Sequence, residues 1–140
     1  MILFPNPDNN PWIDKYNELV LEVKSHESEN IMKKKNQPKR KNGPLTEEYS
    51  GDSIGIHHII PKKIDMSLVN NKDNLLYISL NDHCKLHYYL WKSNPDYAPH
   101  LQFIGYAGRK IGCWNMSDDE WKQLHKDSAA YRKKKKKGLI

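Results

Sequence analysis

The sequence predicts a small α+β domain in which two short strands and the helix after them lie between further helices. Two brief apolar runs, 54–60 and 75–78, have the length of strands and end at proline or polar residues. Apolar residues recur at helical spacing over 11–25. Serines that can cap helices precede the segments that begin at 80 and 118. These signals together predict strands and helices in one domain.

The composition indicates a single modest core. The chain has 140 residues, and 37% of them are hydrophobic. No apolar run approaches the ~20 residues that cross a bilayer, and the N-terminus lacks the basic start of a signal peptide. Cys84 and Cys113 form no Cys-x-x-Cys pair, which argues against a disulfide framework or a zinc ribbon. We expect an intracellular protein with no membrane partner.

Residues 1–25 predict an N-terminal helix. Asn10 can cap it, Pro11 suits its first turn, and Asp14 lies near its positive end. The apolar stripe that we expect in the core consists of Trp12, Tyr16, Leu19, Val20 and Val23.

Residues 26–52 predict no regular element. The segment is polar and charged, and it is interrupted by Pro38, Gly43 and Pro44. We expect a basic linker or mobile loop, of the kind that becomes ordered on binding.

Residues 53–93 predict a strand–strand–helix unit. The first strand covers 54–60 and the second covers 75–78. Ser79 can cap the helix that follows, which ends before Asn94-Pro95.

Residues 94–140 predict a helical extension with a basic tail. One helix is expected over 99–110. A second begins after Ser117, which has the spacing of a capping box with Glu120. Its inner face is expected to carry Trp121, Leu124 and Ala129.

The positive charge is concentrated in two segments. Residues 33–41 carry six positive charges and no negative one, and residues 126–137 carry seven positive charges and one negative. The net charge of the chain is +6, so the remainder is net negative. Two basic segments indicate a polyanionic partner, since Lys and Arg that contact phosphates release counterions. A solvated linker and a solubilising tail would give the same composition.

Four of the seven histidines lie between residues 57 and 87. His57 and His58 are neighbours in the first predicted strand, so their side chains point to opposite faces. His83 and His87 project from one face of the predicted helix, an arrangement that suits a divalent metal ion. A hairpin packed on this helix brings a strand histidine close to that pair as a third ligand. Three protein ligands leave a coordination position open.

The segments "HHIIP", "DNLLYIS" and "HCKLH" resemble the HNH nucleases, whose ββα-metal motif cuts nucleic acid. The match covers about residues 54–91 and is most similar in wording to small phage-encoded and mobile-element HNH endonucleases. The resemblance implies an α+β fold built on the ββα-metal (HNH) motif and flanked by an N-terminal helix and C-terminal helices. Residues 53–93 would form the nuclease core.

The resemblance implies roles for five residues. The metal ligands are His57, His83 and His87; the catalytic residues are His58, as general base, and Asn74, whose amide ties together the loop between the strands and holds the base in place. Many relatives carry an acidic residue two positions before the first ligand, as its hydrogen-bond partner. Gly55 stands there in this sequence, and Asp52 is the candidate substitute.

The implied function is that of a metal-dependent HNH endonuclease that hydrolyses DNA phosphodiester bonds. The resemblance indicates a phage or mobile-element (homing-type) nuclease in the cytoplasm of a bacterial or phage-infected host cell, with products that carry 5′-phosphate and 3′-hydroxyl ends. One divalent metal ion is expected, with zinc, magnesium, manganese, nickel and cobalt as candidates. DNA is the expected partner, and no small-molecule substrate is. The sequence does not decide between a monomer and a dimer.

Eight basic residues are candidate contacts to the DNA backbone: Lys62, Lys63, Arg109, Lys110, Arg132, Lys133, Lys134 and Lys135. Contacts of this kind supply affinity but not sequence choice. A solvated loop is an equal alternative for Lys62 and Lys63. Cations at a helix C-terminus, such as Arg109 and Lys110, are favourable in any case.

Three further functions fit the same pattern. A restriction or defence nuclease would use the same chemistry. A non-catalytic, zinc-stabilised nucleic-acid-binding module needs four ligands, and the sequence offers no convincing fourth beside the three histidines. An RNase that acts through the 2′-hydroxyl is the third alternative. A secreted toxin is disfavoured because no targeting segment is recognised.

Overall fold

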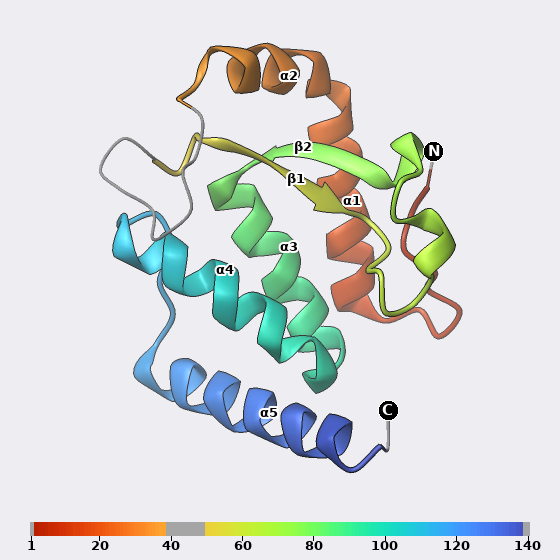
Figure 1. Cartoon of the computed structure of the whole chain (residues 1–140), viewed down its shortest axis with the longest axis vertical. Coiled ribbons are helices and arrows are strands. Elements are labelled where there is room, and N and C mark those ends of the chain that lie inside the picture. The colour runs from red at the N-terminus through yellow and green to blue at the C-terminus, as the bar shows by residue number, and fades with distance from the viewer. Residues whose placement is uncertain (1, 39–49, 139–140) are drawn as a thin grey trace.

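The computed structural model describes residues 2–38 and 50–138 (Figure 1). Two strands, β1 (Ile54–His58) and β2 (Leu75–Ser79), form an antiparallel sheet. The helices are α1 (Pro11–Ser25), α2 (Glu27–Asn36), α3 (Leu80–Ser93), α4 (Ala98–Lys110) and α5 (Asp118–Lys136). Three short 3-10 turns lie at η1 (Met66–Leu68), η2 (Lys72–Asn74) and η3 (Pro95–Tyr97). The predicted α+β class is confirmed.

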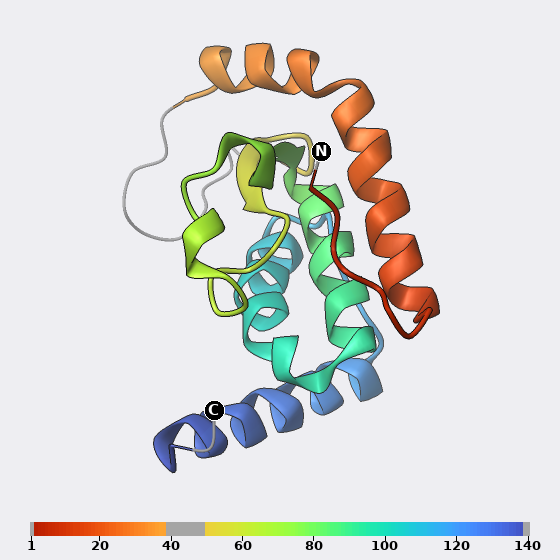
Figure 2. The same ribbon diagram turned by 90° about the vertical axis from the view of Figure 1, so that its right-hand side faces the viewer.

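Helix α3 lies at the centre of the arrangement. The sheet crosses one side of it, and α1 and α4 flank it (Figures 1 and 2). Helix α5 packs against α4 at one end of the molecule, and α2 lies at the opposite end, beside the sheet. No helix in the described part of the chain is long and apolar enough to span a bilayer.

Two apolar clusters hold α3 from opposite sides. The larger one joins α1, the sheet region and α3 through the buried side chains of Ile13, Tyr16, Val20, Val23, Ile59, Leu76, Ile78, Leu86, Leu90 and Tyr97. The second joins α3, α4 and α5 through Trp91, Ala98, Leu101, Trp121 and Leu124. Burial of this apolar surface fixes α3 tightly, so the polar side chains that it carries are held in place.

Three of the predicted helix starts are confirmed by their caps. Side-chain oxygens of Asn10, Ser79 and Ser117 accept the backbone N–H of a residue in the first turn of α1, α3 and α5 respectively. The predicted capping box at α5 is wrong in its second half. The Glu120 carboxylate accepts a hydrogen bond from the Tyr88 hydroxyl at 2.7 Å instead.

The inner face of α5 also differs by one position from the prediction. Trp121 and Leu124 are buried as expected, but Ser128 is buried and Ala129 is exposed. Ser128 lies seven residues after Trp121, which is two helical turns and therefore the same face.

The prediction of a linker over 26–52 is wrong for Glu27–Asn36, which form α2, and residues 39–49 lie outside the described part. Helix α2 was missed because its contacts with the sheet are polar. Asn30 donates to the Tyr77 carbonyl at 2.9 Å, and the Glu27 carboxylate accepts the Tyr77 N–H at 3.0 Å. Gln37, just after α2, bonds both the N–H and the carbonyl of Ile54. Helix α2 is thus held by hydrogen bonds to backbone groups of the strands. Such contacts leave no apolar periodicity in the sequence.

Strand β1 is two residues shorter than the predicted strand over 54–60. The N–H of Ile59 donates to the Asn74 carbonyl at 2.9 Å, and the N–H of Ile60 donates to the Asn74 side chain at 2.8 Å. The chain therefore leaves the ladder after His58 and turns into the loop that leads to β2.

Cys84 is fully buried where α3 meets α4. A Cβ atom added to Gly108 would lie 2.7 Å from Cβ of Trp114 and 3.1 Å from Sγ of Cys84. Glycine is therefore needed at this position mainly because the segment after α4, which carries Trp114, folds back closely onto the helix, with α3 also near.

Candidate metal centre

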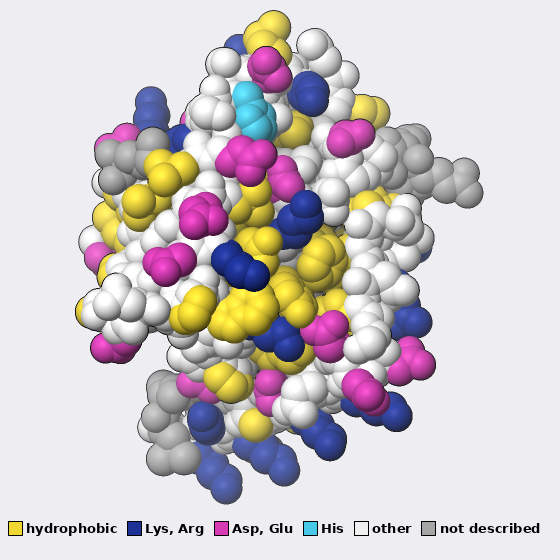
Figure 3. Space-filling view, turned by 180° about the vertical axis from the view of Figure 1, so that it is seen from behind, with side chains coloured by type: hydrophobic (Ala, Val, Ile, Leu, Met, Phe, Trp, Pro, Cys, Tyr) yellow, Lys and Arg dark blue, Asp and Glu magenta, His cyan; other side chains and the backbone are white. Residues whose placement is uncertain are grey.

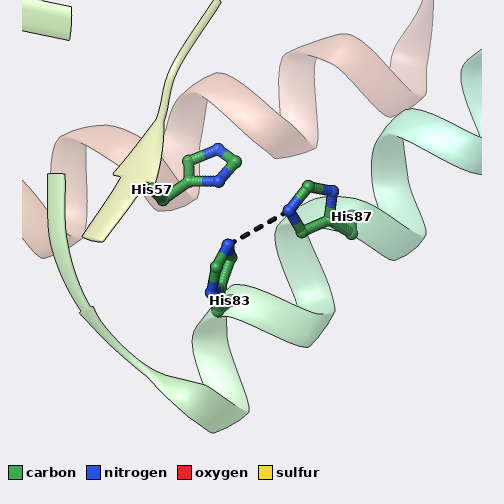
Figure 4. A group of neighbouring side chains, drawn as sticks. All are labelled: His57, His83 and His87. Atoms are coloured by element: carbon green, nitrogen blue, oxygen red, sulfur yellow. Dashed lines mark hydrogen bonds between the residues drawn. The ribbon is translucent and has the colours of Figure 1, made fainter. Parts of the chain in front are cut away.

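Three imidazoles meet between the sheet and α3. His57 comes from β1, and His83 and His87 come from α3 (Figure 4). One ligand nitrogen from each ring lies within 4.8 Å of the others. The ring centroids are 4.8 to 5.0 Å apart. The three predicted metal ligands are thus brought together by the fold.

Local structure explains this convergence. His57 pairs with Leu76 in the sheet register, and its side chain is buried on the face that meets α3. His83 and His87 are one turn apart on α3, so their side chains point the same way. A strand and the helix after the hairpin therefore supply ligands from two rigid elements.

The donor set suits a divalent transition metal. The Nε2 atoms of His83 and His87 are 3.1 Å apart. Two imidazole nitrogens at about 2.0–2.1 Å from a tetrahedral zinc ion would be about 3.3 Å apart, so this pair already has nearly the required spacing. Among the described residues, no Asp, Glu or Cys joins the group. Nitrogen-only ligands favour zinc, nickel or cobalt over magnesium, which prefers oxygen.

The protein environment keeps these imidazoles neutral. Burial, and then the neighbouring histidines, lowers the pKa of His57 and His87 well below the usual value. Burial, followed by His100 and His58, lowers the pKa of His83 to about 4. A neutral imidazole has the lone pair that a metal ion requires, so the site is ready to bind one at neutral pH.

Tyr16 contacts His57, although the sequence did not predict it as part of the site. The Tyr16 hydroxyl, fully buried on α1, lies 2.6 Å from Nε2 of His57. The same hydroxyl donates to the Ile59 carbonyl at 2.7 Å. The predicted substitute, Asp52, is exposed and makes no hydrogen bond or ion pair with His57. Tyr16 was expected only as a core residue, and its place in the apolar stripe of α1 carried no further signal.

His58 lies beside the three imidazoles, but a different contact orients its side chain. It is half-buried, and its Nε2 lies 3.1 Å from the Val69 carbonyl. Because a carbonyl only accepts, Nε2 must carry the hydrogen. The neutral ring then has its lone pair on Nδ1. A histidine held in this tautomer can accept a proton at Nδ1.

Asn74 ties together the loop between the strands, as predicted for its side chain. It is fully buried, accepts the N–H of Ile60 at 2.8 Å and donates to the Ile60 carbonyl at 3.0 Å. It also donates to the Leu68 carbonyl at 3.3 Å. Leu68 precedes Val69, so Asn74 indirectly fixes the carbonyl that orients His58.

The predicted DNA contacts near the site differ in their surroundings. Lys62 is exposed. Lys63 is held by the protein itself, since its ammonium donates to the Asp96 carbonyl at 3.0 Å and lies over the rings of Tyr97 and Tyr131. Partial desolvation against these groups lowers the pKa of Lys63. Lys63 therefore fastens the loop to η3 and α5 in this structure.

Arg109 and Lys110 lie at the end of α4 and are exposed. The Arg109 guanidinium lies 5.3 Å from the centre of the Trp121 ring. Both side chains are far along α4 from its first turn, where His100 approaches His87 of the candidate metal centre.

The basic end of α5 forms an exposed positive surface. Lys and Arg side chains gather along the lower edge of the molecule in Figure 3, over α5, whereas acidic side chains are scattered above them. Arg132 bonds Gln102 at 2.9 Å and Lys134 pairs with Asp96 at 3.2 Å. Lys133 and Lys135 are exposed and, within the described residues, make no side-chain hydrogen bond or ion pair.

His100 is a second neighbour of the site that was not expected from the sequence. Its ring centre lies 5.8 Å from that of His87. Burial, and then the nearby Lys63, lowers its pKa. Its position in the first turn of α4 could be predicted only from the packing of α4 on α3.

No family model, curated protein or solved structure matches this chain. The arrangement of its residues therefore carries the functional argument.

Proposed function

We propose that the protein is a metal-dependent endonuclease of the HNH class that hydrolyses phosphodiester bonds in DNA. One observation carries the proposal. Three neutral imidazoles converge on a point, and the next residue along β1, His58, is held through Nε2 by the Val69 carbonyl, which leaves its lone pair on Nδ1. A structural metal site needs a fourth protein ligand and has no use for an oriented base.

His57, His83 and His87 would hold the cation. When bound, a divalent cation would stabilise negative charge on the scissile phosphate and on the leaving oxygen. The chain contributes three nitrogens and, among the described residues, no carboxylate to this site. The full positive charge of a bound cation would therefore be available to the phosphate.

His58 is the proposed general base. Its Nδ1 takes a proton from the attacking water while the Val69 carbonyl holds Nε2 and stabilises the charge that develops on the ring. Asn74 keeps that carbonyl in place through the loop between β1 and β2. A single metal ion suffices when a histidine removes the proton.

The basic surface of α5 favours a polyanionic substrate. Lysines exposed at its end can approach the phosphate backbone without losing an internal partner. Such contacts give affinity for any sequence and leave the choice of target to other groups. A phage or mobile-element nuclease and a restriction or defence nuclease would both use this chemistry.

The direct test compares His58→Ala with the wild-type chain on supercoiled plasmid DNA after loading with one metal at a time. Loss of a general base costs about 10²–10⁴-fold in rate, so we expect cleavage to fall by at least about 100-fold. DNA binding, measured by fluorescence anisotropy, should be unchanged. Products should carry 5′-phosphate and 3′-hydroxyl ends.

His26→Gln is the matched control, because His26 lies at the junction of α1 and α2 and is half-exposed. It should cut as the wild type does. Chelation with EDTA should abolish cleavage, and zinc, nickel, cobalt or manganese should restore it. Wild-type activity in His58→Ala, or cleavage without any metal, would refute the proposal. Cleavage of RNA but not DNA would assign the site to an RNase.

A further inference from the structure

The single hydroxyl of Tyr16 makes two short contacts that together determine where the hydrogens lie. It is 2.7 Å from the Ile59 carbonyl and 2.6 Å from Nε2 of His57. A phenol has one hydrogen to donate and lone pairs to accept. The carbonyl can only accept, so the hydroxyl hydrogen points to Ile59. Nε2 of His57 must then donate to the hydroxyl oxygen.

The position of this hydrogen determines which nitrogen of His57 can bind a cation. Whatever the charge of the ring, Nε2 carries a hydrogen, so only Nδ1 can offer a lone pair. In Figure 4 one ring nitrogen of His57 faces His83 and His87, and the other is turned away from them. The nitrogen that faces the other imidazoles is therefore the one that the Tyr16 contact leaves unprotonated.

We propose that Tyr16 is a positioning residue of the metal centre, whose hydroxyl holds His57 in the orientation and tautomer that present Nδ1 to the cation. This inference rests on the metal site of the proposed function but not on DNA cleavage. Residues that hydrogen-bond a metal-ligating histidine usually set its orientation, and their loss costs about 10–100-fold in metal affinity or activity.

The surroundings of the hydroxyl support this role over simple core packing. Tyr16 is fully buried, and burial raises its pKa well above the usual value, so it stays a neutral phenol. Among the described residues, no other side chain outside the three imidazoles hydrogen-bonds any of their ring nitrogens. Nδ1 of His87 is buried without a partner among these residues. Tyr16 is therefore the one side-chain support of this kind in the described structure.

The proposed support is neutral and comes from a distant helix. Gly55, where an acidic partner was expected, has no side chain, and a Cβ atom there would contact nothing within 4 Å. A phenol in place of a carboxylate adds no negative charge beside the ligand. The cation then keeps more of its positive charge for the phosphate.

The test is a cobalt titration of the full-length protein, followed by the absorption bands of the bound ion. Tyr16→Phe removes only the hydroxyl. We expect it to bind Co²⁺ and Zn²⁺ about 10–100-fold more weakly than the wild type and to shift the cobalt absorption. Tyr97→Phe is the control, because Tyr97 lies in the same buried cluster but does not contact His57. It should bind cobalt as the wild type does.

A second measurement uses the wild type alone, so it does not depend on whether a variant folds. Long-range ¹⁵N–¹H NMR of the metal-free wild type reports which nitrogen of His57 carries the hydrogen, and we expect Nε2. A hydrogen on Nδ1, or unchanged cobalt affinity in Tyr16→Phe, would overturn the inference. Weaker cobalt binding in Tyr16→Phe together with no DNA cleavage by the wild type would refute the nuclease and leave the positioning role standing.

Discussion

Asn74 is the residue on which the loop between the strands depends. It satisfies both backbone groups of Ile60 and the carbonyl of Leu68 from a fully buried position. Buried groups left without partners cost about 1–3 kcal/mol each. The same amide therefore stabilises the fold and, through Val69, orients His58.

We predict that Asn74→Ala lowers the free energy of unfolding by about 2–4 kcal/mol, because it leaves buried backbone groups unpaired. Urea unfolding of the metal-free protein measures this. Asn71→Ala is the control. The exposed side chain of Asn71 only caps η2, and its loss should cost about 1 kcal/mol or less. Equal losses in the two variants would show that Asn74 does no more than a cap does.

At the scale of single residues, the sequence predicted the histidines and Asn74 because their spacing along one strand–strand–helix unit is informative. Tyr16 could not be predicted in the same way. It is distant in sequence and belongs to an apolar stripe, so its hydroxyl has no signature until α1 packs against the sheet. His100 was missed for the same reason, because α4 brings it near His87 only in the folded protein.

Among the elements, α5 combines two tasks along its length. Its first half packs on α3 and α4 through Trp121 and Leu124, and the Trp91 indole donates to Asp127 at 2.8 Å. Its second half carries the lysine run. Within that run, Arg132 and Lys134 have partners in the protein, whereas Lys133 and Lys135 have none among the described residues.

We predict that replacing Lys133 and Lys135 with alanine weakens DNA binding on all sequences alike. Removing one lysine–phosphate interaction lowers the slope of log K against log salt by about 0.9, so the slope should fall by up to about 2. Anisotropy titrations over a range of salt concentrations measure this. The double variant with Arg132→Ala and Lys134→Ala should lower the slope less, because both side chains already have partners in the protein. Weaker binding to one DNA sequence alone would contradict the prediction.

The helices that were predicted correctly share a feature that α2 lacks. Helices α1, α3, α4 and α5 all bury apolar residues at helical spacing, and α1, α3 and α5 also begin at side-chain caps. Helix α2 has no side-chain cap, and Asn30 is its one buried residue. It is stabilised by hydrogen bonds to the strands, which depend on the sheet and leave no periodic pattern in the sequence.

At the scale of the whole molecule, the buried His57 and the half-buried His83 and His87 make the metal-free protein sensitive to acid. The pKa values of His57, His83 and His87 are lowered by burial, that of His83 to about 4. As the pH falls below about 6.5, the unfolded chain binds protons that the folded chain does not. Stability is therefore full above about pH 6.5 and is lost progressively as the pH falls toward about 4.

We predict that the unfolding temperature of the metal-free protein drops steadily between about pH 6.5 and about 4, as thermal unfolding followed by circular dichroism would show. His83→Gln should make the unfolding temperature depend less steeply on pH. His125→Gln should not, because His125 is exposed on α5. Saturating zinc at about pH 7.5 should raise the unfolding temperature through binding to the folded state alone. A flat profile across this range would contradict the burial of neutral imidazoles.

The hydrogen bond between Tyr16 and His57 also bears on the order in which the site can form during translation. A ribosome makes α1 first, β1 later and the two helical histidines of α3 last. Tyr16 thus leaves the exit tunnel before His57 exists, and His57 before His83 and His87. A nascent chain holds no complete trio of imidazoles until α3 has emerged and docked. If the chain is a nuclease, it is synthesised in a latent form and becomes able to cut only after these distant segments have folded together.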